Sequence, residues 1–132
     1  MKLLIRGMTA LILICCVCVS QAEEAREDNA FYNGVQAYRA YRFDEAAQWF
    51  LQAAEAGDAE AQFLLGRMHY DGNSLSVDNV TAYMWFDISA RNGLPVGARY
   101  REGIAKRMSE EEVALARQQA DDWLIAHPAV PR

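Results

Sequence analysis

An internal repeat is the feature that most constrains how this chain can fold. A tryptophan, a pair of small residues and a glycine occur twice, and each element of the second copy follows the first by 36 residues: Trp49, Ala53-Ala54 and Gly57 against Trp85, Ser89-Ala90 and Gly93. Upstream, Gly34 with Tyr38 is matched 32 residues later by Gly66 with Tyr70. A period in the mid-thirties with small residues at fixed points is typical of helix pairs that stack into a solenoid.

Local signals place the helices within this repeat. The pattern predicts helices over residues 30–41, 44–56, 59–71, 79–92 and 96–107, and a last one from Ser109 to about Ala126. The helix-start signals are Asp44, Asp58, Pro95 and the Ser109/Glu112 capping box, and the helix-end signals are Gly57 and Gly93. We therefore predict an all-α fold, a short right-handed solenoid of antiparallel helix hairpins with a C-terminal capping helix.

The C-terminal part contains a weaker copy of the same pattern. Ala120 and Trp123 repeat the Ala-x-x-Trp spacing of the two earlier units, 38 residues after Trp85. We interpret the last helix as the degenerate second helix of an incomplete third unit, with a polar outer face that closes the stack. The expected divisions are a first hairpin at 30–57, a second at 58–93, and the incomplete third repeat with its capping helix at 94–132. The tryptophans are expected to pack in the core.

The run from Ala61 to Gly72, AQFLLGRMHYDG, suggests a family. It resembles the first helix of a Sel1-like repeat, whose pattern is Ala-Gln, Leu-Gly, Met-Tyr and Gly, and the helix that follows resembles the second. The resemblance covers residues 30 to 100. It departs at His69, where the family usually has Tyr, and in the loop after Gly72, which lacks a second Gly-Val pair. The resemblance implies a tetratricopeptide-like fold, a protein or peptide partner and, from family habit, a Gram-negative host.

The N-terminus has the layout of an export signal. Lys2 and Arg6 precede an apolar run over residues 8–19, and Ser20 and Ala22 are small residues at the positions that a signal peptidase inspects. We predict a cleavable signal peptide at 1–22, cleavage after Ala22, a flexible segment at 23–29, and a periplasmic or secreted protein without stable membrane insertion. Lipidation of a cysteine is a weaker alternative because the preceding residues do not fit the lipoprotein pattern.

Composition excludes several classes of function. The predicted mature chain has 110 residues, with 11 basic against 18 acidic ones and thus a formal charge of −7, which argues against nucleic acid as a partner. All three cysteines lie in the predicted signal, and only His69 and His127 are histidines, so we predict neither a metal site nor a cofactor. Residues 71–78 lack the ligand pattern of a calcium loop, and no Ser-x-x-Lys motif occurs after the signal. We predict that the protein is not an enzyme.

Alignment of the units also predicts a binding surface. In stacked helix pairs the first helix of each unit lines the concave side. Equivalent positions on these helices carry aromatic and basic residues, which predicts a partner-binding groove at Phe31, Val35, Arg39, Phe63, Arg67 and Arg99. In the alternative interpretation, the two phenylalanines pack inside the superhelix. The three arginines suit an acidic peptide or a C-terminal carboxylate.

These features together predict an exported protein-protein interaction scaffold or adaptor of the cell envelope. Two alternatives remain open on the sequence alone. One is an immunity or inhibitor protein that neutralises a toxin. The other is a hydrolase of cell wall or β-lactam.

Overall fold

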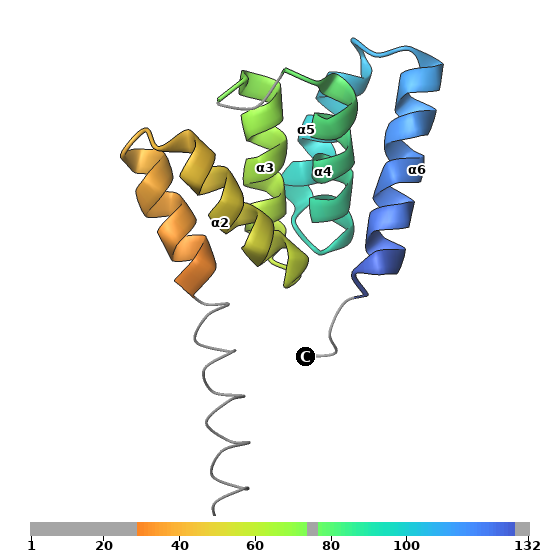
Figure 1. Cartoon of the computed structure of the whole chain (residues 1–132). Coiled ribbons are helices and arrows are strands. Elements are labelled where there is room, and N and C mark those ends of the chain that lie inside the picture. Colours follow the sequence, from red (N-terminus) through yellow and green to blue (C-terminus); the bar gives the residue numbers. More distant parts are fainter. Residues whose placement is uncertain (1–28, 74–76, 129–132) are drawn as a thin grey trace, which may run out of the picture.

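The computed structural model describes residues 29–73 and 77–128, and all regular elements in them are helices (Figure 1). A first helix over residues 29–39 is followed by α2 (Phe43–Glu55), α3 (Ala59–Asp71), α4 (Asn79–Arg91), α5 (Pro95–Ala105) and α6 (Glu110–Ala126). The predicted all-α class is confirmed, and no predicted helix is missing. The predicted signal peptide at 1–22 and residues 23–28 of the predicted flexible segment lie outside the described residues, whereas Asn29 is already helical.

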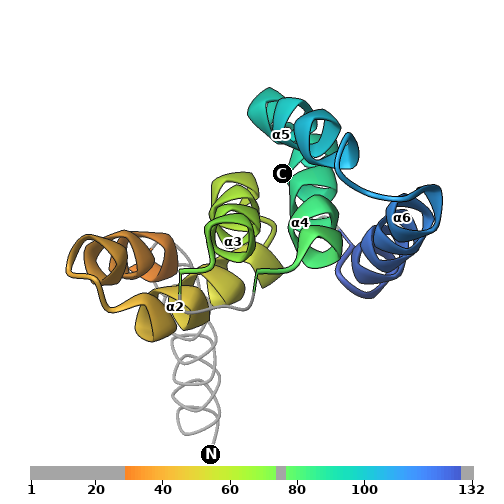
Figure 2. The ribbon, with the colours of Figure 1, turned by 90° about the horizontal axis from the view of Figure 1, so that it is seen from above.

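Successive helices run alongside one another and form two rows (Figure 2). The first helix, α3 and α5 make up one row, and α2, α4 and α6 make up the other. α4 is the centre of the molecule because α3, α5 and α6 all pack against it. Figure 2 shows α5 and α6 on different sides of α4, and the backbone of α6 approaches α4 rather than α5. None of the helices described in residues 29–73 and 77–128 is long and apolar enough to cross a bilayer.

The helix ends follow local side-chain chemistry at most of the predicted positions. The Asp58 carboxylate accepts a hydrogen bond from the backbone N–H of Ala61 at 2.9 Å. The predicted capping box is present: the Glu112 N–H donates to the Ser109 hydroxyl at 3.1 Å, and the Ser109 N–H donates to the Glu112 carboxylate at 2.8 Å. Pro95 occupies the first turn of α5. Gly57 and Gly93 take left-handed φ values of 94° and 98° at the predicted helix ends.

The predicted cap at Asp44 is wrong. α2 begins at Phe43, its N-cap residue is Arg42, and no side chain caps it. The chain turns at Tyr41, which has a φ of 59°, and the Phe43 ring then packs edge-on against Tyr38 at 5.2 Å between centroids. This packing brings Phe43 into the helix, so Asp44 lies in the first turn, where its charge still favours the positive helix end.

Glycines at equivalent positions let the helices approach closely. A Cβ at Gly34 would lie 2.6 Å from the ring of Phe50, and a Cβ at Gly66 would lie 2.7 Å from the ring of Phe86. Both phenylalanines are fully buried. At Gly97 a Cβ would overlap the Ser89 hydroxyl oxygen and lie 2.7 Å from the carbonyl oxygen of Phe86, so both side chain and backbone of α4 exclude it. The repeat in the sequence is therefore a repeat of helix–helix contacts.

The three tryptophans pack against one core cluster, as predicted. Trp85 is 6% exposed, while Trp49 and Trp123 are half-buried against the same cluster. The rings of Trp85 and Trp123 meet edge-on with centroids 5.4 Å apart. Since Trp123 belongs to α6 and Trp85 to α4, this contact joins the C-terminal helix to the repeats.

An ionic network around one buried carboxylate also joins α5 and α6 to α4. Asp87 on α4 has 3% of its side chain exposed and lies 2.5 Å from the Arg101 guanidinium on α5 and 2.7 Å from the Arg91 guanidinium. Arg91 in turn forms an ion pair with Asp121 on α6. The hydrogen bond that the Arg91 guanidinium donates to the Asp121 carboxylate is the main cause that raises the pKa of Arg91, and the charge of Asp87 adds to it.

Gln62 joins three helices and yields a test of the core. It is fully buried, its amide nitrogen donates to the Ala54 carbonyl at 3.0 Å, and its amide oxygen accepts from the Asn92 side chain at 2.9 Å. We expect Gln62→Leu to lower the free energy of unfolding by about 2 kcal/mol, because it removes two buried hydrogen bonds and leaves the Ala54 carbonyl with only the bond from the Gly57 N–H. Urea denaturation measures this loss. Gln48→Leu, at an exposed position of α2, is the control, and an equal loss in both variants would contradict the assignment.

Asp78 yields a prediction about pH. Partial burial raises the pKa of Asp78, but hydrogen bonds from Thr81 and from the Val80 N–H outweigh it, so the pKa lies below the usual 3.8. Because the folded pKa is lowered, the stabilisation is complete above about pH 4 and is lost as the pH falls further. We expect Asp78→Asn and Thr81→Val each to reduce the fall in stability between pH 5 and pH 3. Urea denaturation at pH 5, 4 and 3 checks this, and a slope unchanged from wild type in both variants would refute it.

Candidate partner-binding site

The aromatic and aliphatic members of the predicted groove are half-buried. Phe31 and Val35 pack against the main core cluster, and the Phe31 ring lies 6.0 Å from that of Phe50. Phe63 packs against Phe86 at 5.6 Å between centroids. These positions correspond to the packing alternative for the two phenylalanines.

The three predicted arginines do not share one site. Arg39 is exposed on the first helix. Arg67 on α3 forms an ion pair with Asp71 at 3.1 Å and lies over the ring of Tyr100, 5.7 Å from its centroid. Burial lowers the pKa of Arg67, but the hydrogen bond and the charge of Asp71 outweigh it and raise the pKa. Arg99 and Tyr100 both line a hollow on the surface, so the structure brings Arg67 and Arg99 to one region and leaves Arg39 apart.

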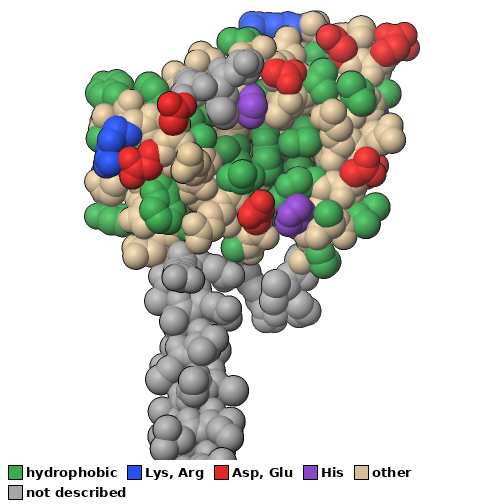
Figure 3. Space-filling view, in the orientation of Figure 1, with side chains coloured by type: hydrophobic (Ala, Val, Ile, Leu, Met, Phe, Trp, Pro, Cys, Tyr) green, Lys and Arg blue, Asp and Glu red, His purple; other side chains and the backbone are tan. Residues whose placement is uncertain are grey.

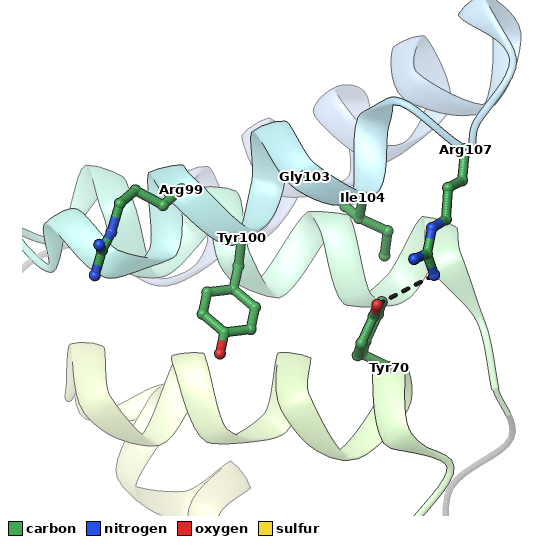
Figure 4. A pocket seen from close by; sticks show the side chains of 6 residues that line it. All are labelled: Tyr70, Arg99, Tyr100, Gly103, Ile104 and Arg107. Atoms are coloured by element: carbon green, nitrogen blue, oxygen red, sulfur yellow. Dashed lines mark hydrogen bonds between the residues drawn. The ribbon is translucent and has the colours of Figure 1, made fainter.

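The hollow lies between α3 and α5 and has a volume of about 480 Å³ (Figure 4). Its lining comes from the end of α3 and from one side of α5 with the residue just beyond it: Tyr70, Arg99, Tyr100, Gly103, Ile104 and Arg107. Ile104 is 2% exposed and belongs to the second core cluster, so it closes the hollow toward the interior. Four of the other lining residues are exposed, which leaves the hollow open to solvent.

Two guanidinium groups stand at the two ends of this hollow. Figure 4 shows Arg99 at one end, Arg107 at the other, and the Tyr100 ring between them, pointing toward α3. The Arg107 guanidinium donates a hydrogen bond to the Tyr70 hydroxyl at 3.1 Å and lies 5.9 Å from the centroid of that ring. The phenol therefore holds Arg107 across the space between α5 and α3 without neutralising its charge.

Arg99 and Arg107 form no ion pair with a carboxylate in the described part of the chain. Four other arginines form ion pairs with carboxylates there, namely Arg42, Arg67, Arg91 and Arg101. Neither Arg99 nor Arg107 has such a partner among residues 29–73 and 77–128. In a chain whose formal net charge is −5, this hollow is a local concentration of free positive charge. Such a site suits a ligand with carboxylates.

Sequence reasoning found only Arg99 among the residues that line the hollow. Tyr70 was identified as a marker of the repeat, and Tyr100 and Arg107 were missed. One signal was present: Arg99, Gly103 and Arg107 are spaced by four residues, which places them on one face of a helix. The contact between Arg107 and Tyr70 spans 37 residues, so no local pattern indicates it.

A different surface carries apolar side chains. Figure 3 shows hydrophobic side chains gathered in the middle of the face formed by α2, α4 and α6. On α6 the ring of His127 stacks on Trp123 with centroids 4.2 Å apart, which covers part of that tryptophan. The described residues hold no group of three or more His, Cys, Asp or Glu side chains placed to bind a metal ion.

Comparison with known proteins agrees with this architecture. The family model described as the Sel1 repeat matches residues 32–58 and again residues 59–94. A solved structure of a protective antigen present in uropathogenic Escherichia coli strains, described as displaying an SLR fold, matches 80% of this chain with 25% identity and a TM-score of 0.71. The match covers 24% of the antigen, so this chain spans about a quarter of its length. No curated protein sequence matches the chain.

Proposed function

We propose that this chain, which is a Sel1 repeat protein, is an exported adaptor that holds a protein partner on the side formed by the first helix, α3 and α5. Repeats of this type suggest protein interaction, and the family is a scaffold family that is generally not enzymatic. Binding without catalysis is accordingly the proposed activity. The observation that carries the proposal is the hollow between α3 and α5, where two arginines without carboxylate partners flank exposed aromatic surface.

Export is the second part of the proposal. It is supported by the two basic residues ahead of the apolar run at 8–19 and by the small residues that end at Ala22. Expression of the full chain with a C-terminal tag, followed by cell fractionation and N-terminal sequencing, tests it. We expect a periplasmic or secreted protein that begins at Glu23. An unprocessed chain that stays in the cytoplasm would contradict export but not partner binding.

Affinity purification tests the partner. The chain from Glu23 is immobilised and exposed to envelope extract of the source organism, and bound proteins are identified by mass spectrometry. We expect a protein that the wild type retains and that the double variant Arg99→Glu, Arg107→Glu loses at least tenfold. The control is Lys106→Glu with Arg117→Glu, which makes the same change of charge at exposed residues outside the hollow, Arg117 being on α6. The absence of any protein enriched over a bare matrix would overturn the adaptor proposal.

A further inference from the structure

Gly103 is an anomaly among the glycines of the chain. It lies in the last turn of α5 with a right-handed backbone, and a Cβ built on it would meet no atom of a neighbouring element within 4 Å. Gly34, Gly66 and Gly97, by contrast, are required by close contacts with a neighbouring helix. A glycine inside a helix costs about 0.5–1 kcal/mol relative to alanine. Neither packing nor backbone conformation within the described residues accounts for Gly103.

The position of Gly103 suggests what it is for. Arg99 and Gly103 lie one turn apart on the same face of α5, Arg107 follows two residues beyond the helix end, and all three line the hollow. The missing side chain leaves the backbone of α5 open to solvent at this point. Glycine serves such a purpose where another backbone must approach closely. This observation is independent of the two charges, and both indicate a ligand at the same place.

From this geometry we infer that the hollow between α3 and α5 binds an extended acidic segment of a partner protein. Its carboxylates pair with Arg99 and Arg107, and its backbone crosses α5 at Gly103. The inference rests on the proposed function and names the chemistry of the partner. Arg99 lies on α5 and Arg107 lies two residues beyond the end of α5 at Ala105, so a rise of about 1.5 Å per residue places their Cα atoms about 12 Å apart. An extended chain advances about 3.3 Å per residue, so acidic residues about four positions apart meet both guanidinium groups.

The remaining lining agrees with this occupant. The Tyr100 ring lies between the two charges and packs against Phe63 and Phe86, and since Tyr100 is 36% exposed, the side chains of a bound peptide can pack against its remaining surface. Tyr70 holds the Arg107 guanidinium in place before binding, which reduces the conformational entropy lost on binding. Arg67 adds positive charge behind Tyr100, although Asp71 already pairs with it. Bidentate pairs of arginine with carboxylate are geometrically specific as well as strong.

A direct binding measurement tests the inference without a natural partner. The probe is a rhodamine-labelled peptide of serine and threonine with two glutamates four positions apart, and its fluorescence anisotropy is measured against the chain from Glu23. We expect saturable binding that falls at least tenfold when both glutamates are replaced by glutamine, and at least tenfold in Arg99→Met with Arg107→Met. Gly103→Ala is expected to weaken binding severalfold while raising Tm, because alanine is the better helix former.

In Gly103→Ala, Tm is expected to rise while affinity for the peptide falls. This combination distinguishes a glycine needed for binding from one needed only for the structure. Lys106→Met with Arg117→Met, at exposed residues outside the hollow, is the control for charge and should bind as wild type does. The inference would be overturned if the glutamine peptide bound as tightly as the glutamate peptide. It would also be overturned if the Arg99/Arg107 or the Gly103 variant bound as tightly as wild type, or if the control lost as much affinity as the Arg99/Arg107 variant. Full competition by inorganic phosphate at the concentration of the peptide would also overturn it. In these cases a partner retained by affinity purification would still support the adaptor, at another surface.

Discussion

Deletion of residues 109–132 is expected to leave a chain that does not fold cooperatively. The deletion removes α6, whose Ala116 and Ala120 are fully buried and whose Trp123 packs on Trp85. It also removes Asp121, which pairs with Arg91. The free energy of unfolding of a domain of this size is only about 5–15 kcal/mol. We expect the loss of stability from exposing one side of its central helix to be larger than this total. Stacks of helix pairs commonly need about three units to be stable, and the family model matches two in this chain.

Thermal denaturation followed by circular dichroism measures this effect, and dye binding reports exposed apolar surface. A graded version replaces Trp123 by alanine, which is expected to cost about 3 kcal/mol, toward the low end for a tryptophan because its ring is only half-buried. Leu115→Ala is the matched control on the same helix, where the side chain is 48% exposed, and it should change stability by less than about 0.5 kcal/mol. A cooperative thermal transition after deletion of residues 109–132 would refute the structural role of α6.

Replacement of both Arg91 and Arg101 by methionine is expected to lower the free energy of unfolding by about 3 kcal/mol. The change leaves the carboxylate of Asp87, 3% exposed, without either of its ion-pair partners. An uncompensated buried charge is far more costly than the loss of an ion pair at the surface. Arg101 of α5 pairs with Asp87, and Arg91 pairs with Asp121 of α6, so the double replacement removes an ionic link from each helix to α4 and the two helices are expected to loosen together.

Urea denaturation and hydrogen exchange of the α5 and α6 amides measure the consequences. Arg99→Met with Arg107→Met is the matched control, because it removes the same two charges where no carboxylate is paired with them in the described residues. It is expected to leave stability within about 0.5 kcal/mol of wild type. A triple variant that adds Asp87→Leu should recover most of the lost free energy of unfolding, because it removes the buried carboxylate that has no ion-pair partner. Equal stability of the two double variants would show that Asp87 does not organise this region.

Much of the candidate site escaped prediction for an identifiable reason. The groove was predicted from equivalent positions in the repeat, which correctly found that first helices of the pairs carry Arg67 and Arg99. Alignment of equivalent positions does not reveal the spacing between neighbouring helices. The hollow depends on that spacing, because it lies between α5 and the end of α3. The repeat also made Phe31 and Phe63 alike, and both turn out to be half-buried against phenylalanines of the following helix.

The sequence by itself determined the elements of this protein. The period of 36, the Asp58 cap, the Ser109/Glu112 capping box and the left-handed glycines all specify structure within a few residues, and each predicted helix is present. The exception, Asp44, was overridden by the packing of Phe43 on Tyr38. Only the tertiary structure decided that α5 and α6 lie on different sides of α4, and that Arg107 reaches Tyr70. Such contacts join residues 14 to 37 positions apart, and their energy depends on burial and geometry that no local pattern records.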